Sequence, residues 1–499
     1  MTDRCPSRAA IRFGVTALTV AAIVTLSTKA GEAQDDLPAR QFQTGQTFAA
    51  AGQYEEALAD FEAVVALYPT SVVADNALLE IARHYLETAE DFDLAAEYAG
   101  RVVGDASYAQ TDAAAEAYVF LARVAIARGH TTDNLEAALG ELQRGLGLWP
   151  SAEIVPQSLF FTGEAHRYAG QLEEALAAYG RVAAEYPETV WAARAGLGAG
   201  LLRARIGDPV AAMAELQHVR DQWPDSQEAR TALQRITVLY RLYIRSPEHA
   251  YGLDGEPFST QRSPRVEELV VDQQGRVFYA TGSGIGTLDP DAAADAPSGG
   301  RPRGLLLDRQ GVVTAIVGGS LTAKDVAPIQ LAIPRPGDRP KELRDIDAAG
   351  VTGDGDWLVM DGDEREIHRF SPSGDYRSMF VPVRAKRLAV GPNDHIAVIA
   401  GNNEIRLFAE GRSLGEIPRQ GPNYKIDDPV DLAFDAIGHL YVADEKGVYV
   451  FGLDQALMMR VPSSETVPGA PRKITAFALD QFGRIVVADD DGKQILQYQ

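Results

Sequence analysis

The chain has 499 residues, enough for two to four domains, and its 46% hydrophobic and 23% charged residues are the proportions of packed globular proteins. Its formal net charge of −23 at pH 7 excludes nucleic acid as a partner, because like charges repel. The single cysteine, Cys5, excludes an internal disulfide and a zinc site built from several thiolates.

Residues 1–33 have the features of a secretory signal peptide. A basic start is followed by an apolar stretch, Phe13–Leu26, and then by small residues suited to cleavage after Ala33. The alternative is an uncleaved anchor, but a membrane-spanning helix needs ~20 apolar residues. Cys5 precedes the apolar stretch and is therefore not a lipidation site. We expect a cleaved periplasmic or secreted protein with no membrane span in the mature chain.

Residues 38–248 predict an array of helical hairpins, because they are rich in Ala, Leu and Glu with helical periodicity. In the clearest unit, the small residues Gly45 and Ala57 stand where two helices approach closely. Phe48 and Phe61 fill the space between the helices, and Pro69 ends the second one. We interpret residues 226–245 as a last helix that caps the array.

A fixed spacing of 37 residues links three of these units. It separates Ala138, Ala175 and Ala212, and likewise Pro150, Pro187 and Pro224. The units resemble tetratricopeptide repeats, whose period is ~34 residues. Tyr54-Glu55-Glu56-Ala57 and Tyr68-Pro69 are similar to the periplasmic members, which include outer-membrane assembly lipoproteins and Tol-Pal coordinator proteins. This resemblance implies protein or peptide partners, although the chain lacks the lipidated cysteine of the assembly lipoproteins.

Residues 250–499 predict a six-bladed β-propeller. The chain changes there to Val, Ile, Gly and Asp with alternating apolar residues, and six units of strand, Asp/Gly turn and strand follow. The fifth unit, from Pro429 to Asp444, resembles an NHL repeat. In these turns we expect Asp to cap backbone amides and Gly to adopt positive φ. The fold class is therefore α + β multidomain, an α-solenoid of hairpins followed by a propeller.

The sixth unit begins at Ile474 and leaves room for only three strands before Gln499. An open propeller would expose unpaired strand edges. We therefore expect Tyr251–Arg262 to pair with Ile495–Tyr498 and close the ring. The alternative is a flexible linker beside a three-stranded last blade.

Few motifs in the sequence carry chemistry. It contains no P-loop, HExxH or GxSxG motif, and its eight histidines are scattered. NHL-like propellers include lyases and lactonases with a metal in the central channel, which implies His or carboxylates converging from several inner strands. The sequence predicts no such set, so we expect no enzyme activity and no cofactor. Calcium is the one exception, because Asp361, Asp363 and Asp489–Asp491 could supply oxygen ligands.

Alignment of the blades predicts two surfaces for partners. The first is a mixed-charge ring at one mouth of the channel, formed by Glu268, Arg303, Asp347, Arg387 and Asp431. The second is a basic arc on the opposite face, formed by Arg276, His395, His439 and Arg484.

The sequence therefore predicts an exported, non-catalytic scaffold in the cell envelope that binds proteins or peptides. Its expected parts are a signal peptide (1–33), a repeat domain (38–248) and a propeller (250–499). The alternative is a lyase- or lactonase-like channel enzyme, or a carbohydrate-binding module, with the repeats as a docking arm. The partner and the oligomeric state stay open.

Overall fold

The computed structural model describes residues 26–108, 111–150, 153–260, 265–297, 300–335, 337–363, 365–409, 411–462, 464 and 469–499. Most of the predicted signal peptide, residues 1–25, lies outside the described residues. The chain divides into two compact units, Met1–Tyr186 and Pro187–Gln499. Each unit is described by itself below.

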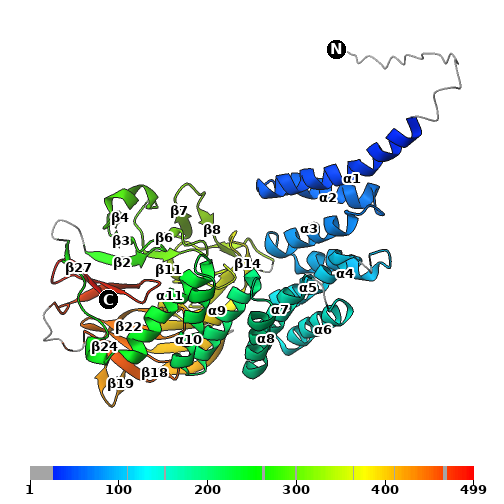
Figure 1. Ribbon diagram of the computed structural model, residues 1–499. Helices are drawn as coiled ribbons and strands as arrows, with labels where there is room; N and C mark the ends of the chain where they lie inside the picture. Colours follow the sequence, from blue (N-terminus) through cyan, green and yellow to red (C-terminus); the bar gives the residue numbers. More distant parts are fainter. Residues whose placement is uncertain are drawn as a thin grey trace, which may run out of the picture. The chain divides into compact units, whose positions relative to one another are not determined.

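The first unit is an array of helical hairpins (Figure 1). Its described helices are α1 (Leu26–Ala50), α2 (Tyr54–Leu67), α3 (Ala74–Glu87), α4 (Phe92–Gly104), α5 (Asp112–Ala127), α6 (Thr132–Leu148), α7 (Val155–Tyr168) and α8 (Leu172–Glu185). Consecutive helices pack in pairs, and α5 also contacts both α3 and α7. These three helices form one layer, and we call its surface the A-helix face. The predicted repeat architecture is confirmed.

Close approach within a hairpin explains the repeated small residues. A Cβ atom at Gly45 would lie 2.7 Å from the ring of Phe61, and one at Gly163 would lie 2.5 Å from the ring of Tyr179. Both distances are below van der Waals contact, so only glycine lets the aromatic ring fill the space between the two helices. Phe61 and Tyr179 are buried as a result.

The second unit begins with three more helices and continues into the propeller. The helices are α9 (Val190–Arg205), α10 (Pro209–Gln222) and α11 (Gln227–Leu239), and α11 continues into the π-helical turn η1 (Tyr240–Ile244). Helix gives way to strand between His249 and Phe258, close to the boundary predicted at residue 250. The compact units, however, divide at Tyr186, so these helices belong with the propeller.

Six sheets form the blades. They are β2 (Val266–Val271), β3 (Val277–Thr281) and β4 (Gly284–Thr287); β5 (Gly304–Leu307), β6 (Val313–Val317), β7 (Ser320–Ala323) and β8 (Ile329–Gln330); β11 (Ile346–Val351), β12 (Trp357–Asp361), β13 (Ile367–Phe370) and β14 (Tyr376–Val381); β15 (Ala385–Val390), β16 (His395–Ala400), β17 (Ile405–Ala409) and β18 (Arg412–Ile417); β21 (Pro429–Phe434), β22 (Leu440–Asp444), β23 (Gly447–Phe451) and β24 (Leu457–Val461); and β25 (Ile474–Leu479), β26 (Ile485–Asp489), β27 (Gln494–Tyr498) and β1 (Phe258–Ser259). Two short hairpins, β9 (Ala332–Ile333) with β10 (Lys341–Glu342) and β19 (Gln420–Gly421) with β20 (Tyr424–Lys425), lie between blades.

The first strands of the blades form a closed ring around the channel. Each contacts the next in the order β2, β5, β11, β15, β21 and β25, and β25 contacts β2 again. The six-bladed propeller predicted from the sequence is confirmed. Strands β2 and β15 are three blades apart in either direction, so they face each other across the channel.

The ring closes as expected, by a strand from the segment before the first blade. Strand β1 pairs antiparallel with β27, with Phe258 opposite Ile495. Gly252 and Gln499 exchange two backbone hydrogen bonds of 3.0 Å, and the amide of Thr260 donates to the Lys493 carbonyl. The last blade therefore has four strands, one of which precedes the first blade in sequence.

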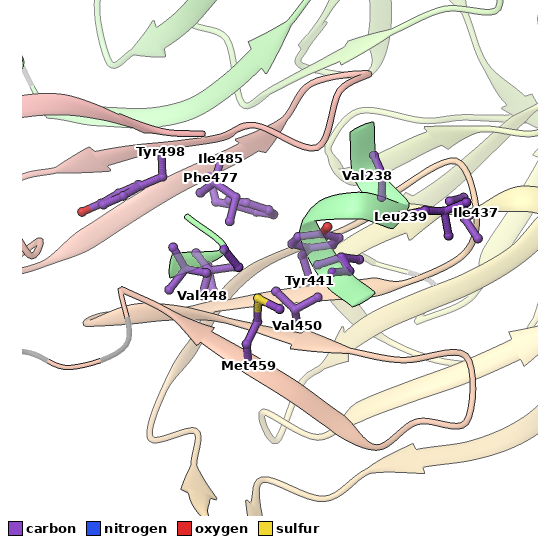
Figure 2. Packing of buried hydrophobic residues seen from close by; sticks show 14 of the residues in the cluster. Val238, Leu239, Ile437, Tyr441, Val448, Val450, Met459, Phe477, Ile485 and Tyr498 are labelled. Atoms are coloured by element: carbon purple, nitrogen blue, oxygen red, sulfur yellow. The ribbon is translucent and has the colours of Figure 1, made fainter. Parts of the chain in front are cut away.

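The helices of the second unit share a hydrophobic core with the last two blades (Figure 2). Val238 and Leu239 of α11 are buried in the same cluster as Ile437, Tyr441 and Phe477 of the propeller. Burial of apolar surface contributes about 25 cal/mol per Å². Helices α9 to α11 are therefore attached to the propeller by packing rather than by a free linker.

The blade turns use Asp and Gly as predicted. The Asp272 carboxylate accepts from the amides of Gln274 and Arg276, and the Asp480 carboxylate accepts from the amides of Phe482 and Arg484. Gly275 has a φ of 80°, which an L-residue rarely adopts. These carboxylates hold the turns that connect the first and second strands.

Candidate functional site

The structure brings together three of the five residues predicted to form a ring at the channel mouth, Glu268, Arg387 and Asp431. Nη2 of Arg387, on β15, lies 3.0 Å from Oε1 of Glu268, on β2. Because these strands face each other, the ion pair crosses the channel. Asp431, on the neighbouring β21, has its Oδ1 atom 3.9 Å from Nε of Arg387.

Burial of these groups shifts their pKa values. Burial, together with the charge of Asp431, raises the pKa of Glu268 to about 8, against the opposing effect of Arg387. Burial also raises the pKa of Asp431, while Arg387 and the amide of Leu432 oppose the shift. The negative charge of Glu268 in turn raises the pKa of Arg387. Arg387 therefore stays positively charged, and the carboxyls of Glu268 and Asp431 both interact with it.

The remaining two ring residues pair with each other between the second and third blades, and the charge of Asp347 also acts on Arg387. Nη1 of Arg303 lies 2.7 Å from Oδ1 of Asp345 and 3.9 Å from Oδ1 of Asp347. Burial and the nearby Asp345 carboxylate raise the pKa of Asp347. Sequence reasoning missed Asp345, although it stands two residues before Asp347 and directly before the same strand.

The predicted basic arc is corrected by the structure. His439 has no exposed surface. Its Nδ1 atom lies 2.6 Å from Oδ2 of Asp435, and its Nε2 atom lies 2.9 Å from the hydroxyl of Tyr243 in η1. We call residues 187–251, which contain α9 to α11 and η1, the helical segment. Although burial raises the pKa of Asp435, its contacts with His439 bring that pKa below the usual value. His439 is part of the contact between helix and propeller rather than of an open surface.

The other members of the arc do not form one basic surface either. Arg276 is paired with Asp272 and Asp295, and Arg484 is paired with Asp480. These carboxylates neutralise both guanidinium groups. His395 is exposed and lies at the rim of a separate cavity between the fourth and fifth blades. The arc is interrupted because the helical segment covers the turns of the fifth and sixth blades.

Several hydrogen bonds join the helical segment to these turns. The Gln234 amide donates to the side chain of Gln481 at 2.9 Å, and Nη1 of Arg241 donates to the Phe482 carbonyl at 2.7 Å. The Tyr251 hydroxyl donates to the Gly483 carbonyl at 2.9 Å. This face of the propeller is therefore occupied in part by the chain itself.

The carboxylates considered for calcium have protein partners. Oδ2 of Asp361 lies 2.5 Å from Nζ of Lys341, and Oδ1 of Asp489 accepts from the amides of Arg472 and Lys473. Asp490 is paired with Lys493 at 2.7 Å. Among the described residues, no three His, Cys, Asp or Glu side chains gather as the ligands of a metal ion would. Within the same residues, no helix has the length and apolar character needed to cross a membrane.

The A-helix face carries a strip of alternating charge that sequence reasoning missed. Arg83 of α3 is paired with Glu116 of α5 at 3.1 Å, and Arg123 of α5 is paired with Glu87 of α3. Both guanidinium groups also lie over the ring of Phe120, at 5.5 and 5.1 Å from its centroid. A signal was present in the sequence, since Glu116 and Arg123 lie two helical turns apart on one face of a helix.

One protein-family model matches part of the helical repeats. The tetratricopeptide repeat model matches residues 41–71 and 157–189. No curated protein sequence matches the chain. A solved tetratricopeptide repeat protein of Thermus thermophilus is 20% identical with a TM-score of 0.32, over 39% of this chain and 98% of that one.

Solved propellers are similar to the second half of the chain. A virginiamycin B lyase of Staphylococcus aureus is 13% identical with a TM-score of 0.32, over 48% of this chain and 82% of that one. A gluconolactonase of Xanthomonas campestris is 17% identical with a TM-score of 0.35, over 48% and 87%. Likenesses at this level of identity concern the fold alone. The repeat match and the observed sheets describe a chain of tetratricopeptide-type helical repeats followed by a six-bladed β-propeller.

Proposed function

We propose that this chain is a non-catalytic scaffold of the cell envelope that binds proteins or peptides through its repeats and through the open mouth of its propeller. The observation that carries the proposal is the strip of paired charges on the A-helix face. The strip combines two arginines with Glu87 and Glu116, and side-chain exposures there are between 24% and 45%. The charged side chains of this surface are therefore partly shielded from water, while a partner can still contact them.

The chemistry of this strip suits an extended peptide. Arginine donates several hydrogen bonds in a fixed geometry and stacks on aromatic rings, while carboxylates accept from peptide amides. Burial raises the pKa of the neighbouring Glu80, although Arg83 opposes the shift, so the strip is shielded from water at that end. Exchange of an internal ion pair for a peptide contact gives specificity rather than large affinity.

The propeller channel favours binding over metal-assisted chemistry. The guanidinium of Arg387 lies between carboxylates from the first and fifth blades. The guanidinium of Arg387 occupies the position between these carboxyls that a divalent cation would need. The ring is therefore better suited to a charged partner at the mouth than to a metal ion within it.

A second candidate function is catalysis at the same mouth. One observation favours it, because burial raises the pKa of Glu268 to about 8. A carboxyl that titrates near neutral pH is suited to proton transfer. Turnover of lactone or glycoside substrates that is lost in Glu268→Gln would support this candidate over the scaffold.

The scaffold proposal is tested by crosslinking in the native cell followed by capture of the full chain. The double variant Arg83→Glu/Arg123→Glu should lose the crosslinked partner, because it reverses both positive charges of the strip. The matched control is Arg144→Glu, on α6 outside the A-helix face, where Arg144 is paired only locally with Glu141. Equal capture by the double variant and the control would contradict the proposal.

We also infer that the chain acts outside the cytoplasm, since its first 33 residues have the pattern of a secretory signal. Mass spectrometry of the protein from its native cell should find an N-terminus at Gln34. An intact Met1 in the functional fraction would contradict this inference.

A further inference from the structure

The helical repeats of the second unit end on a helix that would begin a further hairpin. Helix α9 begins at Val190 and pairs with α10, and α11 begins at Gln227, a spacing of 37 residues. This is the spacing of the repeats, so α11 takes the place of the first helix of a hairpin. It packs on α9, on α10 and, through Val238 and Leu239, on the propeller. No α-helix follows α11 and η1 in the part of the chain that the structure describes.

Three contacts define the side of α9 that faces its hairpin partner. A Cβ atom at Gly196 would lie 2.7 Å from the side chain of Val219 on α10, and one at Gly200 would lie 2.7 Å from that of Leu216. Arg203, about one turn further along α9, is paired with a glutamate of α10. The positions rise along α9 as they fall along α10, so the two helices are antiparallel. The second helix lies directly against this side of the first, and glycine makes room for it.

The equivalent side of α11 is apolar and exposed. Positions 37 residues after 196, 200 and 203 are Leu233, Thr237 and Tyr240. Leu233 and Tyr240 are 40% and 51% exposed, and Ile244, about one turn further, is 48% exposed. We call these four residues the α11 stripe. A contiguous apolar stripe along one side of a helix marks a site of interaction.

We propose that the α11 stripe binds an amphipathic helix of a partner protein, which lies antiparallel to α11 and completes the last hairpin. The register of the repeats identifies the occupant as a helix, because a helix covers the equivalent side of α9. A helix that lays its apolar side on such a surface is a recurring mode of peptide recognition. This surface belongs to the second unit and is distinct from the A-helix face and from the channel mouth.

The α11 stripe also determines which side chains the partner helix carries. Leu233 and Thr237 stand where α9 has glycine, so the room that Leu216 and Val219 of α10 use is taken by the side chains of α11 itself. Overpacking of such a contact is destabilising. We therefore expect the partner helix to carry alanine where α10 has Leu216 and Val219.

The test is fluorescence anisotropy with labelled peptides and the purified full chain. The first probe is a peptide of residues 208–224 that carries Leu216→Ala and Val219→Ala, and the matched probe keeps both residues. Each peptide is stapled on its outward side, so that helix formation does not limit binding. We expect the alanine peptide to bind about tenfold more tightly than the matched peptide. Equal binding of the two peptides, or no binding of the alanine peptide, would overturn the proposal.

Variants of the chain identify the surface. Tyr240→Glu should abolish binding of the alanine peptide, because it places a charge at an apolar contact. The control is Val210→Glu, since Val210 is 65% exposed and lies on α10 rather than on α11. Leu233→Gly/Thr237→Gly reproduces the glycines of α9, so this variant should prefer the matched peptide. Wild-type binding in a folded Tyr240→Glu variant, or an unchanged preference in a folded glycine variant, would overturn the assignment.

The alternative occupant is a second copy of the chain, and sedimentation of the full chain without peptide tests it. The proposal expects the wild type and the Tyr240→Glu variant to sediment alike. A dimer that forms in the wild type and is lost in Tyr240→Glu would overturn the partner helix in favour of a second copy.

Discussion

Nη2 of Arg387 lies 3.0 Å from Oε1 of Glu268, and the two residues come from blades on opposite sides of the propeller. A contact across the channel connects strands that are not neighbours in any sheet. It therefore places one guanidinium and one titratable carboxyl beside each other at the mouth of the channel. The following predictions test this pair, the attachment of the helices and the closure of the ring.

The first prediction concerns Glu268, whose pKa burial raises to about 8. A carboxyl with a raised folded-state pKa stabilises the fold below its unfolded pKa of about 4.3 and loses that stabilisation as pH rises towards 8. Glu268→Gln cannot titrate. The free energy of unfolding of the wild type should therefore fall relative to the variant by up to about 1.4 kcal/mol per pH unit across this window. Denaturant unfolding at several pH values measures this difference between the wild type and the variant. The same change of unfolding free energy with pH in both proteins would refute the prediction.

The second prediction concerns the buried His439. His439→Ala leaves the Asp435 carboxylate buried without its main partner, so the free energy of unfolding should fall by about 3–5 kcal/mol. Tyr243→Phe removes one neutral hydrogen bond and should cost about 1 kcal/mol. The exposed His395 provides the control, because surface substitutions usually change stability by less than about 0.5 kcal/mol. Urea unfolding that ranks the three variants differently would contradict this account of the contact.

The third prediction concerns where the chain can be divided. A fragment of residues 187–499 keeps the core shared by α11 and the last two blades. A fragment of residues 250–499 loses Val238 and Leu239 and exposes the apolar surface they covered. The shorter fragment should melt at a lower temperature or aggregate. Equal melting temperatures would mean that the helices contribute nothing to the propeller.

The fourth prediction concerns the closing strand. Removal of residues 250–263 deletes the pairing of β1 with β27 and the two hydrogen bonds between Gly252 and Gln499. Each ladder bond contributes about 1 kcal/mol. A fragment that starts at residue 264 should therefore melt below one that starts at residue 250. The two fragments share the same loss of helices, so the difference reports on this segment, through strand closure together with the contacts of Ala250 and Tyr251.

The fold could be predicted from the sequence because its signals are local and repeated. The 37-residue spacing marks each helical hairpin, and each Asp/Gly turn marks one blade of the propeller. The closure of the propeller ring was predicted from the number of strands that fit after Ile474. The ring at the mouth was predicted in the same way, since Glu268, Arg387 and Asp431 occupy matched blade positions.

The basic arc could not be predicted in this way, because matched positions do not reveal what covers them. Alignment of the blades placed His439 on a surface, whereas Tyr243 and the helical segment bury it. A local signal was nevertheless present. Asp272, Asp435 and Asp480 each stand four residues before the Arg or His side chain that they contact.

The central claim is that the A-helix face binds a partner, and site-specific photo-crosslinking tests it most directly. A photoreactive residue is placed at Glu87 on α3 and, as the control, at the exposed Glu136 on α6. The account predicts a discrete crosslinked protein from Glu87 in the native cell and none from Glu136. The same product from both positions, or none from Glu87, would contradict it.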